Sequence, residues 1–349
     1  MLIMLRTKRR SSSSNVVATA IIAVLVLLVM HVMGSSESEG QEQLQLRVGF
    51  YSKSCPPAES IVHAVVKEAV LSVPRNAAVL LRIHFHDCFV EGCDGSILID
   101  NGDISERHAG AHAGVGGFEI IEAAKARLES TCPGVVSCSD IVAMAARDAV
   151  FLSNGLFYEV QTGRRDGRVS NWTLAADMPD VNDSIHMLKA KFRQKGLKDK
   201  DLVLLSAAHT IGTTACFFMG TRLYQFNSTG GSDPAINPRF LPVLKSICPP
   251  GGDVNVRLAL DAATEFVFDD LILHNIKNGF AVISSDARLY DSRHTRRIVD
   301  LYTQNGTSYK HEKPPSFKVD FAASMVKMGR IGVKTGSQGE IRRVCSSFN

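Results

Sequence analysis

Arg82 and His86 lie four residues apart in a segment, residues 77–89, whose apolar positions predict a helix. Residues at i and i+4 share one face of a helix, so both side chains can point into a single pocket. An imidazole can accept a proton and pass it on, while a guanidinium keeps its charge and stabilises negative charge on an oxygen. The pair suits heterolysis of a polar O–O bond, although for the pair alone a surface helix with scattered charges is the simpler interpretation.

The segments that would position these side chains have the periodicity of helices. Apolar residues recur at intervals of three and four, and Gly, Pro and Asn occupy the connecting loops. The expected helices cover residues 57–72, 77–89, 118–130, 139–152, 185–195, 199–205, 266–278 and 317–328. Runs that alternate apolar and polar residues are scarce. The sequence therefore predicts an all-α, mainly helical fold.

A second candidate site follows the Arg82–His86 pair directly. Cys88 and Cys93 bracket Phe-Val-Glu-Gly, and Asp87, Asp94 and Ser96 lie around them. Acidic and hydroxyl oxygens beside a tight glycine turn can coordinate a hard cation such as Ca²⁺, with main-chain carbonyls completing the coordination sphere. An ordinary polar loop closed by a disulfide is an equally good interpretation of this segment alone.

His209 ends an apolar run, Leu205-Ser-Ala-Ala-His209. A single histidine in this position is most often a buried or capping residue, and its alternative role is axial ligand to a haem iron. Such a ligand needs a carboxylate on its other ring nitrogen to fix the tautomer and raise its basicity. Asp286 is a candidate for this partner, but nothing in its local sequence distinguishes it.

The N-terminal segment is typical of a secretory signal. A basic cluster in residues 6–10 precedes an apolar run, residues 16–33, and three small residues, 34–36. This order predicts a signal peptide over residues 1–36, followed by a short polar segment over 37–47, and an uncleaved signal anchor is the alternative. Eight cysteines agree with an oxidising compartment. So do four Asn-x-Ser/Thr glycosylation candidates, at Asn171, Asn182, Asn227 and Asn305.

The overall charge is mildly basic, with a formal net charge of +4 and a pI of about 8.6. Part of this charge belongs to the basic cluster that signal cleavage would remove. Nothing in the distribution indicates a nucleic-acid-binding surface. The balance favours at most a loose contact with anionic polymers.

Taken together, the chain closely resembles the secreted plant haem peroxidases (class III) over nearly the whole region 48–349. Several long, collinear motifs carry the resemblance. They are Val48-Gly-Phe-Tyr-Ser-Lys-Ser-Cys55-Pro, Leu81-Arg-Ile-His-Phe-His-Asp-Cys-Phe-Val90, Gly92-Cys-Asp-Gly-Ser96, Ser137-Cys-Ser-Asp-Ile141, Gly163-Arg-Arg-Asp-Gly167, Leu205-Ser-Ala-Ala-His-Thr-Ile-Gly212, Ser284-Ser-Asp286 and Gly336-Ser-Gln-Gly-Glu-Ile-Arg342.

The resemblance implies one haem peroxidase domain over residues 48–349, in which a distal and a proximal helical half sandwich haem b. His86 would be the distal base, Arg82 would stabilise charge as the O–O bond breaks, and Phe85 would form a wall of the pocket. His209 would be the proximal iron ligand, with Asp286 behind it. The carbonyl of Pro179 matches a substrate contact of the family.

The family also holds two Ca²⁺ ions and four disulfides, which the resemblance transfers to this chain. The first ion would be bound by Asp87, Val90, Gly92, Asp94 and Ser96. The second would be bound by Thr210, Asp261, Thr264, Val267 and Asp269. The implied disulfides are Cys55–Cys132, Cys88–Cys93, Cys138–Cys345 and Cys216–Cys248; eight cysteines alone would permit 105 pairings.

The implied activity is H₂O₂-dependent one-electron oxidation of small phenolic donors, which would serve lignin or phenol oxidation, cell-wall cross-linking, peroxide removal or the response to oxidative stress. A monomer is expected, secreted to the extracellular space or cell wall, because the chain ends shortly after Cys345 whereas vacuolar members carry an extension. We expect no nucleic-acid partner and no membrane association after signal cleavage; anionic cell-wall polymers are a candidate partner. The alternative is a secreted, Ca²⁺-bound, wall-binding haem protein with little peroxidase turnover.

One position departs from the family pattern. The family usually has an Asn whose oxygen accepts a hydrogen bond from the distal imidazole, and His112 occupies that position here. A neutral imidazole can accept through one nitrogen, but a protonated one cannot. We therefore expect peroxide activation to weaken more steeply on acidification than in a relative with Asn. The glycine-rich run around Gly116 also leaves a shifted alignment open.

Overall fold

The computed structural model describes residues 46–304 and 315–349. The expected signal peptide, nearly all of the polar segment over 37–47 and the sequon at Asn305 lie outside the described residues. None of the helices in the described ranges is long and apolar enough to cross a membrane.

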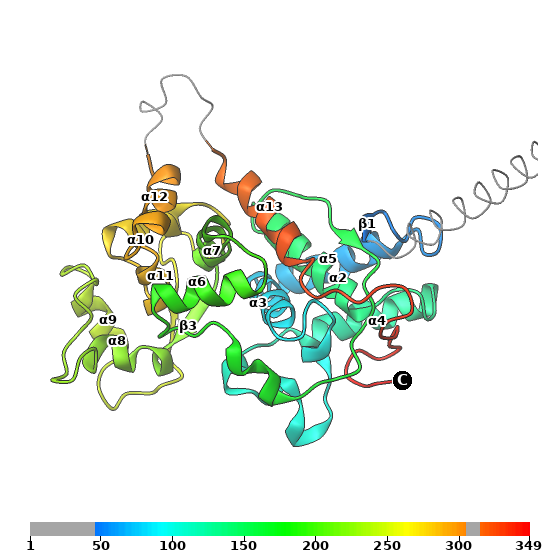
Figure 1. The fold of residues 1–349 in the computed structure, drawn as a ribbon, viewed down its shortest axis with the longest axis horizontal. Coiled ribbons are helices and arrows are strands. Elements are labelled where there is room, and N and C mark those ends of the chain that lie inside the picture. The colour runs from blue at the N-terminus through cyan, green and yellow to red at the C-terminus, as the bar shows by residue number, and fades with distance from the viewer. Residues whose placement is uncertain (1–45, 305–314) are drawn as a thin grey trace, which may run out of the picture. The chain divides into compact units, whose positions relative to one another are not determined.

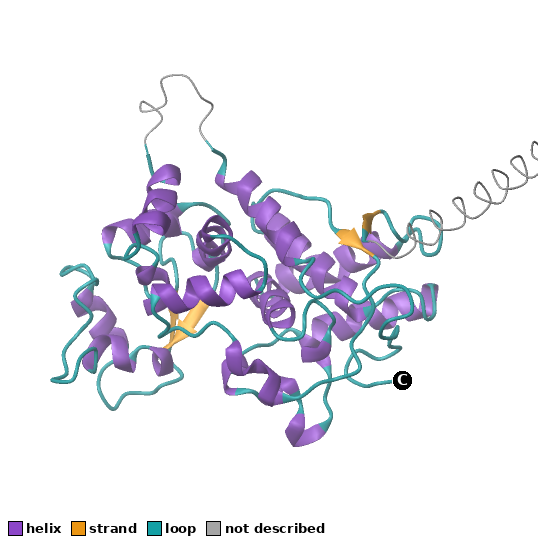
Figure 2. Ribbon diagram, in the orientation of Figure 1, coloured by secondary structure: helices purple, strands orange, loops and turns teal. Residues whose placement is uncertain are grey.

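The described residues form a mainly helical structure with two small antiparallel strand pairs (Figures 1 and 2), which confirms the predicted fold class. The strands are β1 (Arg47–Val48) paired with β2 (Gln161–Thr162), and β3 (Thr213–Ala215) paired with β4 (Arg257–Ala259). The α-helices are α2 (Ala58–Ser72), α3 (Asn76–Phe89), α4 (Phe118–Thr131), α5 (Cys138–Leu152), α6 (Ile185–Gln194), α7 (Asp199–Ser206), α8 (Gly220–Tyr224), α9 (Leu241–Ile247), α10 (Leu271–Asn278), α11 (Ser284–Arg288), α12 (Arg293–Tyr302) and α13 (Phe317–Met328).

Helix α5 is the central helix of the larger hydrophobic core. Every residue from Cys138 to Val150 is buried, and α2, α3 and α4 all pack against it. Its many alanines let these neighbours approach closely, since protein interiors are packed to high density. The Ser137 side chain begins the helix by accepting a hydrogen bond from the N–H of Asp140 (3.2 Å). The helix that carries Arg82 and His86 therefore has a rigid support.

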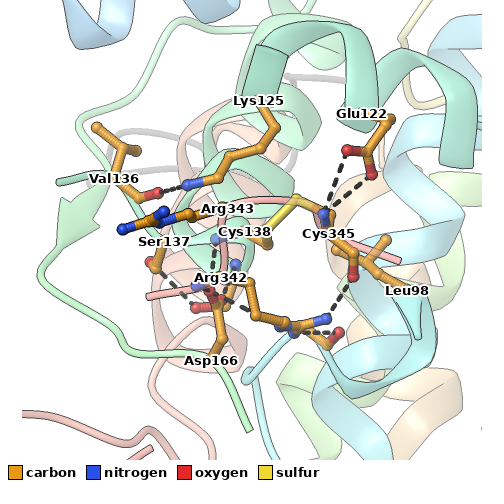
Figure 3. The surroundings of a disulfide bond; sticks show 12 residues. Leu98, Glu122, Lys125, Val136, Ser137, Cys138, Asp166, Arg342, Arg343 and Cys345 are labelled. Atoms are coloured by element: carbon orange, nitrogen blue, oxygen red, sulfur yellow. Dashed lines mark hydrogen bonds and ion pairs between the residues drawn. A yellow bond between two sulfur atoms is a disulfide. The ribbon is translucent and has the colours of Figure 1, made fainter. Parts of the chain in front are cut away.

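The disulfides are the four pairs that the resemblance implies: Cys55–Cys132, Cys88–Cys93, Cys138–Cys345 and Cys216–Cys248. The bridge between Cys138 and Cys345 spans 207 residues and ties the C-terminal segment to the start of α5 (Figure 3). Beside it, the Asp166 carboxylate accepts hydrogen bonds from the N–H groups of Cys138 (3.1 Å) and Arg342 (2.9 Å). In the chain-entropy picture a loop of this length stabilises the fold by about 5 kcal/mol.

One helix begins later than the sequence predicts. The helix expected over residues 266–278 starts at Leu271 in α10. The carboxylate of Asp269 accepts hydrogen bonds from the N–H of Leu271 (3.0 Å) and from the hydroxyl of Thr210 (3.1 Å). Because side-chain contacts of this kind offer the backbone an alternative to the helix, residues 266–270 form a loop despite their apolar pattern.

Candidate active site

The distal pair lies on one face of α3, as its four-residue spacing predicts. Nε of Arg82 donates a hydrogen bond to Nε2 of His86 (3.0 Å), and Nη2 of Arg82 donates to the carbonyl of Ala113 (3.1 Å). Phe85 packs edge-on against the His86 ring, with 5.4 Å between ring centroids, and against Phe89 at 4.4 Å. Because Nε2 of His86 accepts a hydrogen bond, this nitrogen carries a lone pair and can take up a proton.

His112 lies directly behind His86. It ends the 3₁₀ turn η4 (Gly110–His112), and its Nδ1 is 2.7 Å from Nδ1 of His86. On its other side, Nε2 of His112 is 3.5 Å from Oε1 of Glu106, which begins the turn η3 (Glu106–His108). The side chains of both His112 and Glu106 are fully buried. In the structure, therefore, it is His112 that contacts the distal histidine, as the alignment without a shift in the glycine-rich run predicts.

Burial and neighbouring charges keep His86 neutral. Burial lowers the pKa of His86 well below its ordinary value, and the charges of Arg82, His112 and His209 lower it further. A neutral imidazole is the form that can act as a base. His86 is therefore ready to accept a proton at neutral pH.

The proximal histidine follows α7 in the 3₁₀ turn η6 (Ala207–Thr210). Nδ1 of His209 contacts both carboxylate oxygens of the buried Asp286, at 2.9 and 3.1 Å. Burial lowers the pKa of His209, but the charge and hydrogen bond of Asp286 outweigh this and the pKa is raised. Because Nδ1–H is donated to the carboxylate, the lone pair is on Nε2, which has no hydrogen-bond partner among the residues described.

The elements that carry the distal and proximal residues lie next to each other. Helix α3 packs against η6. The charge of Arg82 lowers the pKa of His209, and His209 in turn lowers that of His86, so the groups are close enough to interact electrostatically. The His209 side chain is 37% exposed although its partner Asp286 is buried. An unbonded imidazole nitrogen on η6 thus lies in the neighbourhood of a neutral base and a guanidinium on α3.

This donor set fits haem b. An axial histidine binds iron through a free ring nitrogen and is oriented by a hydrogen bond from its other N–H to a carboxylate, carbonyl or water; His209 and Asp286 supply both. On the neighbouring α3, Arg82 and His86 supply a charged donor and a proton acceptor rather than an apolar wall. Such polar groups distinguish a pocket that activates a ligand from one that only binds it.

The loop after α3 has the chemistry of a Ca²⁺ site. Both carboxylate oxygens of Asp87 and the hydroxyl of Ser96 are buried without a hydrogen-bond partner in the described part of the chain. Buried polar atoms of this kind normally have partners, and carboxylate and hydroxyl oxygens are ligands that Ca²⁺ prefers, so this donor set fits a hard cation. No group of three or more His, Cys, Asp or Glu side chains with metal-binding geometry occurs within residues 46–304 and 315–349. A cation here would therefore depend on hydroxyl and carbonyl oxygens, including those of Val90 and Gly92.

The second set of expected Ca²⁺ ligands lies beside the proximal histidine. Oδ2 of Asp261 and Oγ1 of Thr264 are buried, and neither atom has a hydrogen-bond partner in the described ranges. The hydroxyl of Thr210, next to His209, donates to Asp269 (3.1 Å), and Val267 lies in the same loop. This donor set also fits a hard cation.

Other expected site residues are half-buried or exposed. Pro179 is in the loop between η5 (Trp172–Asp177) and α6, and its contact with substrate stays a prediction. Of the described sequons, Asn182 and Asn227 are exposed, whereas Asn171 is half-buried and its Oδ1 accepts from the N–H of Thr173 (2.9 Å). Attachment of glycans at these positions also stays a prediction.

Glu106 is the residue of the site that sequence reasoning did not identify. It is one acidic residue among several in a polar loop, and no periodic pattern distinguishes it. Glu106 precedes His112 by six residues, and this spacing alone predicts no contact between them. The two side chains meet because two short 3₁₀ turns, η3 and η4, lie between them.

Comparisons with known proteins agree with this geometry. The peroxidase family model matches residues 62–305. Peroxidase 43 from Arabidopsis thaliana is 64% identical over 304 residues, which cover 87% of this chain and 92% of the relative. Peroxidase 13 from the same plant is 56% identical over 327 residues (93% and 98%), and Peroxidase N1 from Nicotiana tabacum is 47% identical over 329 residues (94% and 96%).

These matches cover nearly the whole described chain, and they include the helix and the turn that carry the two facing histidines. The chain therefore belongs to the plant haem peroxidases of class III, and it is an H₂O₂-dependent oxidoreductase.

Proposed function

We propose that this enzyme uses haem b to oxidise small phenolic donors by single electrons, with Arg82 and His86 activating peroxide and His209 holding the iron. The observation that carries the proposal is the arrangement of a neutral His86 and a charged Arg82 opposite an imidazole backed by Asp286. Bound haem would supply the iron that binds peroxide and the redox equivalents for electron transfer.

The proton is moved by His86. Its Nε2 takes the proton of the bound peroxide and delivers it to the departing oxygen, which leaves as water. The imidazole serves in turn as base and acid, so the proton never needs to reach solvent. Phe85, packed against the ring, restricts its orientation.

The charge is stabilised by Arg82. Burial, with a smaller contribution from the charge of Arg257, lowers the pKa of Arg82 to about 10, so the guanidinium is still cationic at neutral pH. It is placed to donate to the oxygen on which negative charge develops. Its hydrogen bond to Ala113 holds it in position before peroxide arrives.

Two Ca²⁺ ions would complete the structure, bound by the oxygen ligands described above. All eight cysteines are in disulfides, which supports folding in an oxidising compartment and thus secretion to the extracellular space or cell wall. The donor proposed here, a phenol, would approach near Pro179.

The test is an absorption spectrum of the purified protein before and after one equivalent of H₂O₂, followed by the rate of guaiacol oxidation. We expect a Soret band, a rapid spectral change and turnover. His209→Ala should lose the iron, and His86→Ala should retain the haem but react with peroxide at least about 100-fold more slowly. A Soret band without a spectral response would refute the proposed activity and favour the wall-binding alternative.

A further inference from the structure

A lysine from the C-terminal part of the chain contacts one of the carboxylates in the loop after α3. Nζ of Lys334 is 2.5 Å from Oδ2 of Asp94. Asp94 is an expected ligand of the first Ca²⁺ ion, and its side chain is 2% exposed, whereas that of Lys334 is 30% exposed. The ammonium group of a half-buried lysine is therefore bound to a buried ligand of the proposed ion.

The main chain holds Lys334 in this position. Its carbonyl accepts a hydrogen bond from the N–H of Arg165 (2.8 Å), so its backbone is fixed on one side. Three residues earlier, the carbonyl of Ile331 accepts from the N–H of Cys93 (2.8 Å), which belongs to the loop after α3. The segment 331–334 is thus bonded to the same loop, and the contact between Lys334 and Asp94 is part of the fold.

Negative charge is concentrated in this loop. Asp87 and Asp94 are both buried, and neither oxygen of Asp87 has a hydrogen-bond partner in the described part of the chain. Among residues 46–304 and 315–349, Lys334 is the one cation that forms an ion pair with either aspartate. Buried carboxylates are costly unless they are paired. Whenever Ca²⁺ leaves the site, Lys334 is therefore the positive charge that still offsets part of this cost.

A group that hydrogen-bonds to a metal ligand can change the affinity for the metal in two opposite ways. It can orient the ligand, which raises the affinity, or its charge can repel the ion, which lowers the affinity. Asp94 is oriented without the lysine, because its Oδ1 accepts from the N–H of Ser96 (3.1 Å) and its carbonyl accepts from the N–H of Gly167 (2.7 Å). Its carboxylate also packs on Gly167, where a Cβ would lie 2.2 Å from Oδ2. The repulsion by the charge of Lys334 therefore outweighs its contribution to orientation.

We propose that Lys334 is a built-in counter-charge of the first Ca²⁺ site: it stabilises the loop when the ion is absent and lowers the affinity for the ion when it is present. The inference rests on the proposed ion site and adds the residue that sets how readily the ion leaves it. Asp87 directly follows His86 in the chain, so a loop that stays folded without Ca²⁺ also retains the end of the helix that carries the distal base.

The first test is the affinity of the purified holoenzyme for Ca²⁺, measured by competition with a chromophoric chelator. The binding step that Asp87→Ala removes identifies the first site. Lys334→Met and Lys334→Gln both lack the charge, and Gln keeps an amide that can donate to Asp94. We expect the Kd of this step to fall at least about 10-fold in both variants, because a cation in a partly buried position is incompletely screened from the ion.

Two control variants separate charge from folding. Lys334→Arg keeps the positive charge, so its Kd should stay within about 2-fold of the wild-type value. Lys327→Met removes a comparable pair elsewhere, since Nζ of Lys327 on α13 is 2.8 Å from Oδ1 of the buried Asp201 on α7, and neither residue is an expected Ca²⁺ ligand. We expect no change in the Kd of Lys327→Met.

The melting temperature gives a second readout that does not depend on activity. A 10-fold lower Kd corresponds to about 1.4 kcal/mol, and an ion that binds more tightly stabilises the folded state by that much more. The fall in melting temperature on chelation should therefore be at least about 2 °C larger in Lys334→Met than in the wild type. In Lys327→Met it should equal the wild-type fall.

The opposite results would overturn the inference. An unchanged or weaker affinity in Lys334→Met would show that the lysine only orients Asp94, and equal falls in melting temperature on chelation would show an ordinary ion pair. Tighter binding in Lys334→Arg as well would exclude charge as the cause. If Asp87→Ala removes no binding step, the proposed first ion site itself is refuted, and the inference with it.

Discussion

Replacing Asp286 with Asn tests the proximal half of the site. The carboxylate of Asp286 is 1% exposed, and both its oxygens contact Nδ1 of His209, at 2.9 and 3.1 Å. Asn has nearly the same shape but offers a single neutral oxygen. The substitution therefore removes a negative charge beside the proximal ligand while leaving a hydrogen bond in place.

The size of the effect follows from the two kinds of hydrogen bond. A bond to a charged group contributes about 1.5–3 kcal/mol, against about 0.5–1.5 kcal/mol for a neutral one, so the difference is about 1–1.5 kcal/mol. An anionic partner stabilises ferric iron more than ferrous iron, because the ferric ion carries one more positive charge. If this whole free-energy difference stabilises the ferric state of the wild type, its loss in Asp286→Asn raises the reduction potential by about 40–65 mV. The conversion is that about 59 mV corresponds to about 1.4 kcal/mol for one electron.

The assay is a spectroelectrochemical titration of the purified holoenzymes at neutral pH. Asp201→Asn is the control, because Asp201 is equally buried but is paired with Lys327 on α13 and bonds to neither histidine. We expect its potential to equal that of the wild type. A shift of less than about 15 mV for Asp286→Asn, or a shift to lower potential, would refute the assignment of Asp286 as the group that tunes His209.

Three further predictions concern acidity, metal and stability. The rate of reaction with H₂O₂ should fall more steeply on acidification in the wild type than in His112→Asn, because protonation of His112 removes the acceptor for His86; stopped-flow profiles that superimpose would contradict this. Removing Ca²⁺ with a chelator should lower the melting temperature by at least about 4 °C, since one site filled at 100 times its Kd contributes about 2.7 kcal/mol. The melting temperature of Asp87→Ala should be lower than that of the wild type before chelation and should fall less when the chelator is added. Asp201→Asn should lower the free energy of unfolding by about 1–2 kcal/mol at pH 7. Burial raises the pKa of Asp201, but its hydrogen bonds, above all that from Lys327, outweigh this and lower it, so the stabilisation is present above the ordinary carboxyl pKa and is lost as the pH falls through the lowered value. Denaturant titrations from pH 7 to 3 should show the free energies of unfolding of the wild type and Asp201→Asn converging. A constant difference between them would disprove the explanation.

Features that depend on neighbours along the chain could be predicted from the sequence. Arg82 and His86 share a face of α3 because a helix repeats every 3.6 residues, whatever it packs against. The helical class follows from the same periodicity. The ten residues 87–96 around Cys88 and Cys93 also contain all the proposed ligands of the first cation. Local geometry was sufficient in each case.

Periodicity was not sufficient where tertiary contacts compete with it. The apolar residues of 266–270 fit a helix, yet the hydrogen bond from Thr210 to Asp269 keeps them in a loop before α10. The short helices α8, α9 and α11 have five to seven residues each, too few turns for a periodic pattern to be distinguished. Roles that came from family resemblance, including the disulfide pairs, were not available from spacing.

The residue types and their local spacing by themselves determined that this chain could hold a base and a cation on one helix face, and that its fold is helical. Only the tertiary structure decided which distant groups contact the site histidines. Asp286 contacts His209 from 77 residues away along the chain, and Glu106 lies beside His112, which contacts His86. The physical reason is range. Backbone hydrogen bonds and side-chain periodicity act over a few residues, whereas the pKa of a histidine and its choice of tautomer depend on whichever charges the packed core brings to its other nitrogen.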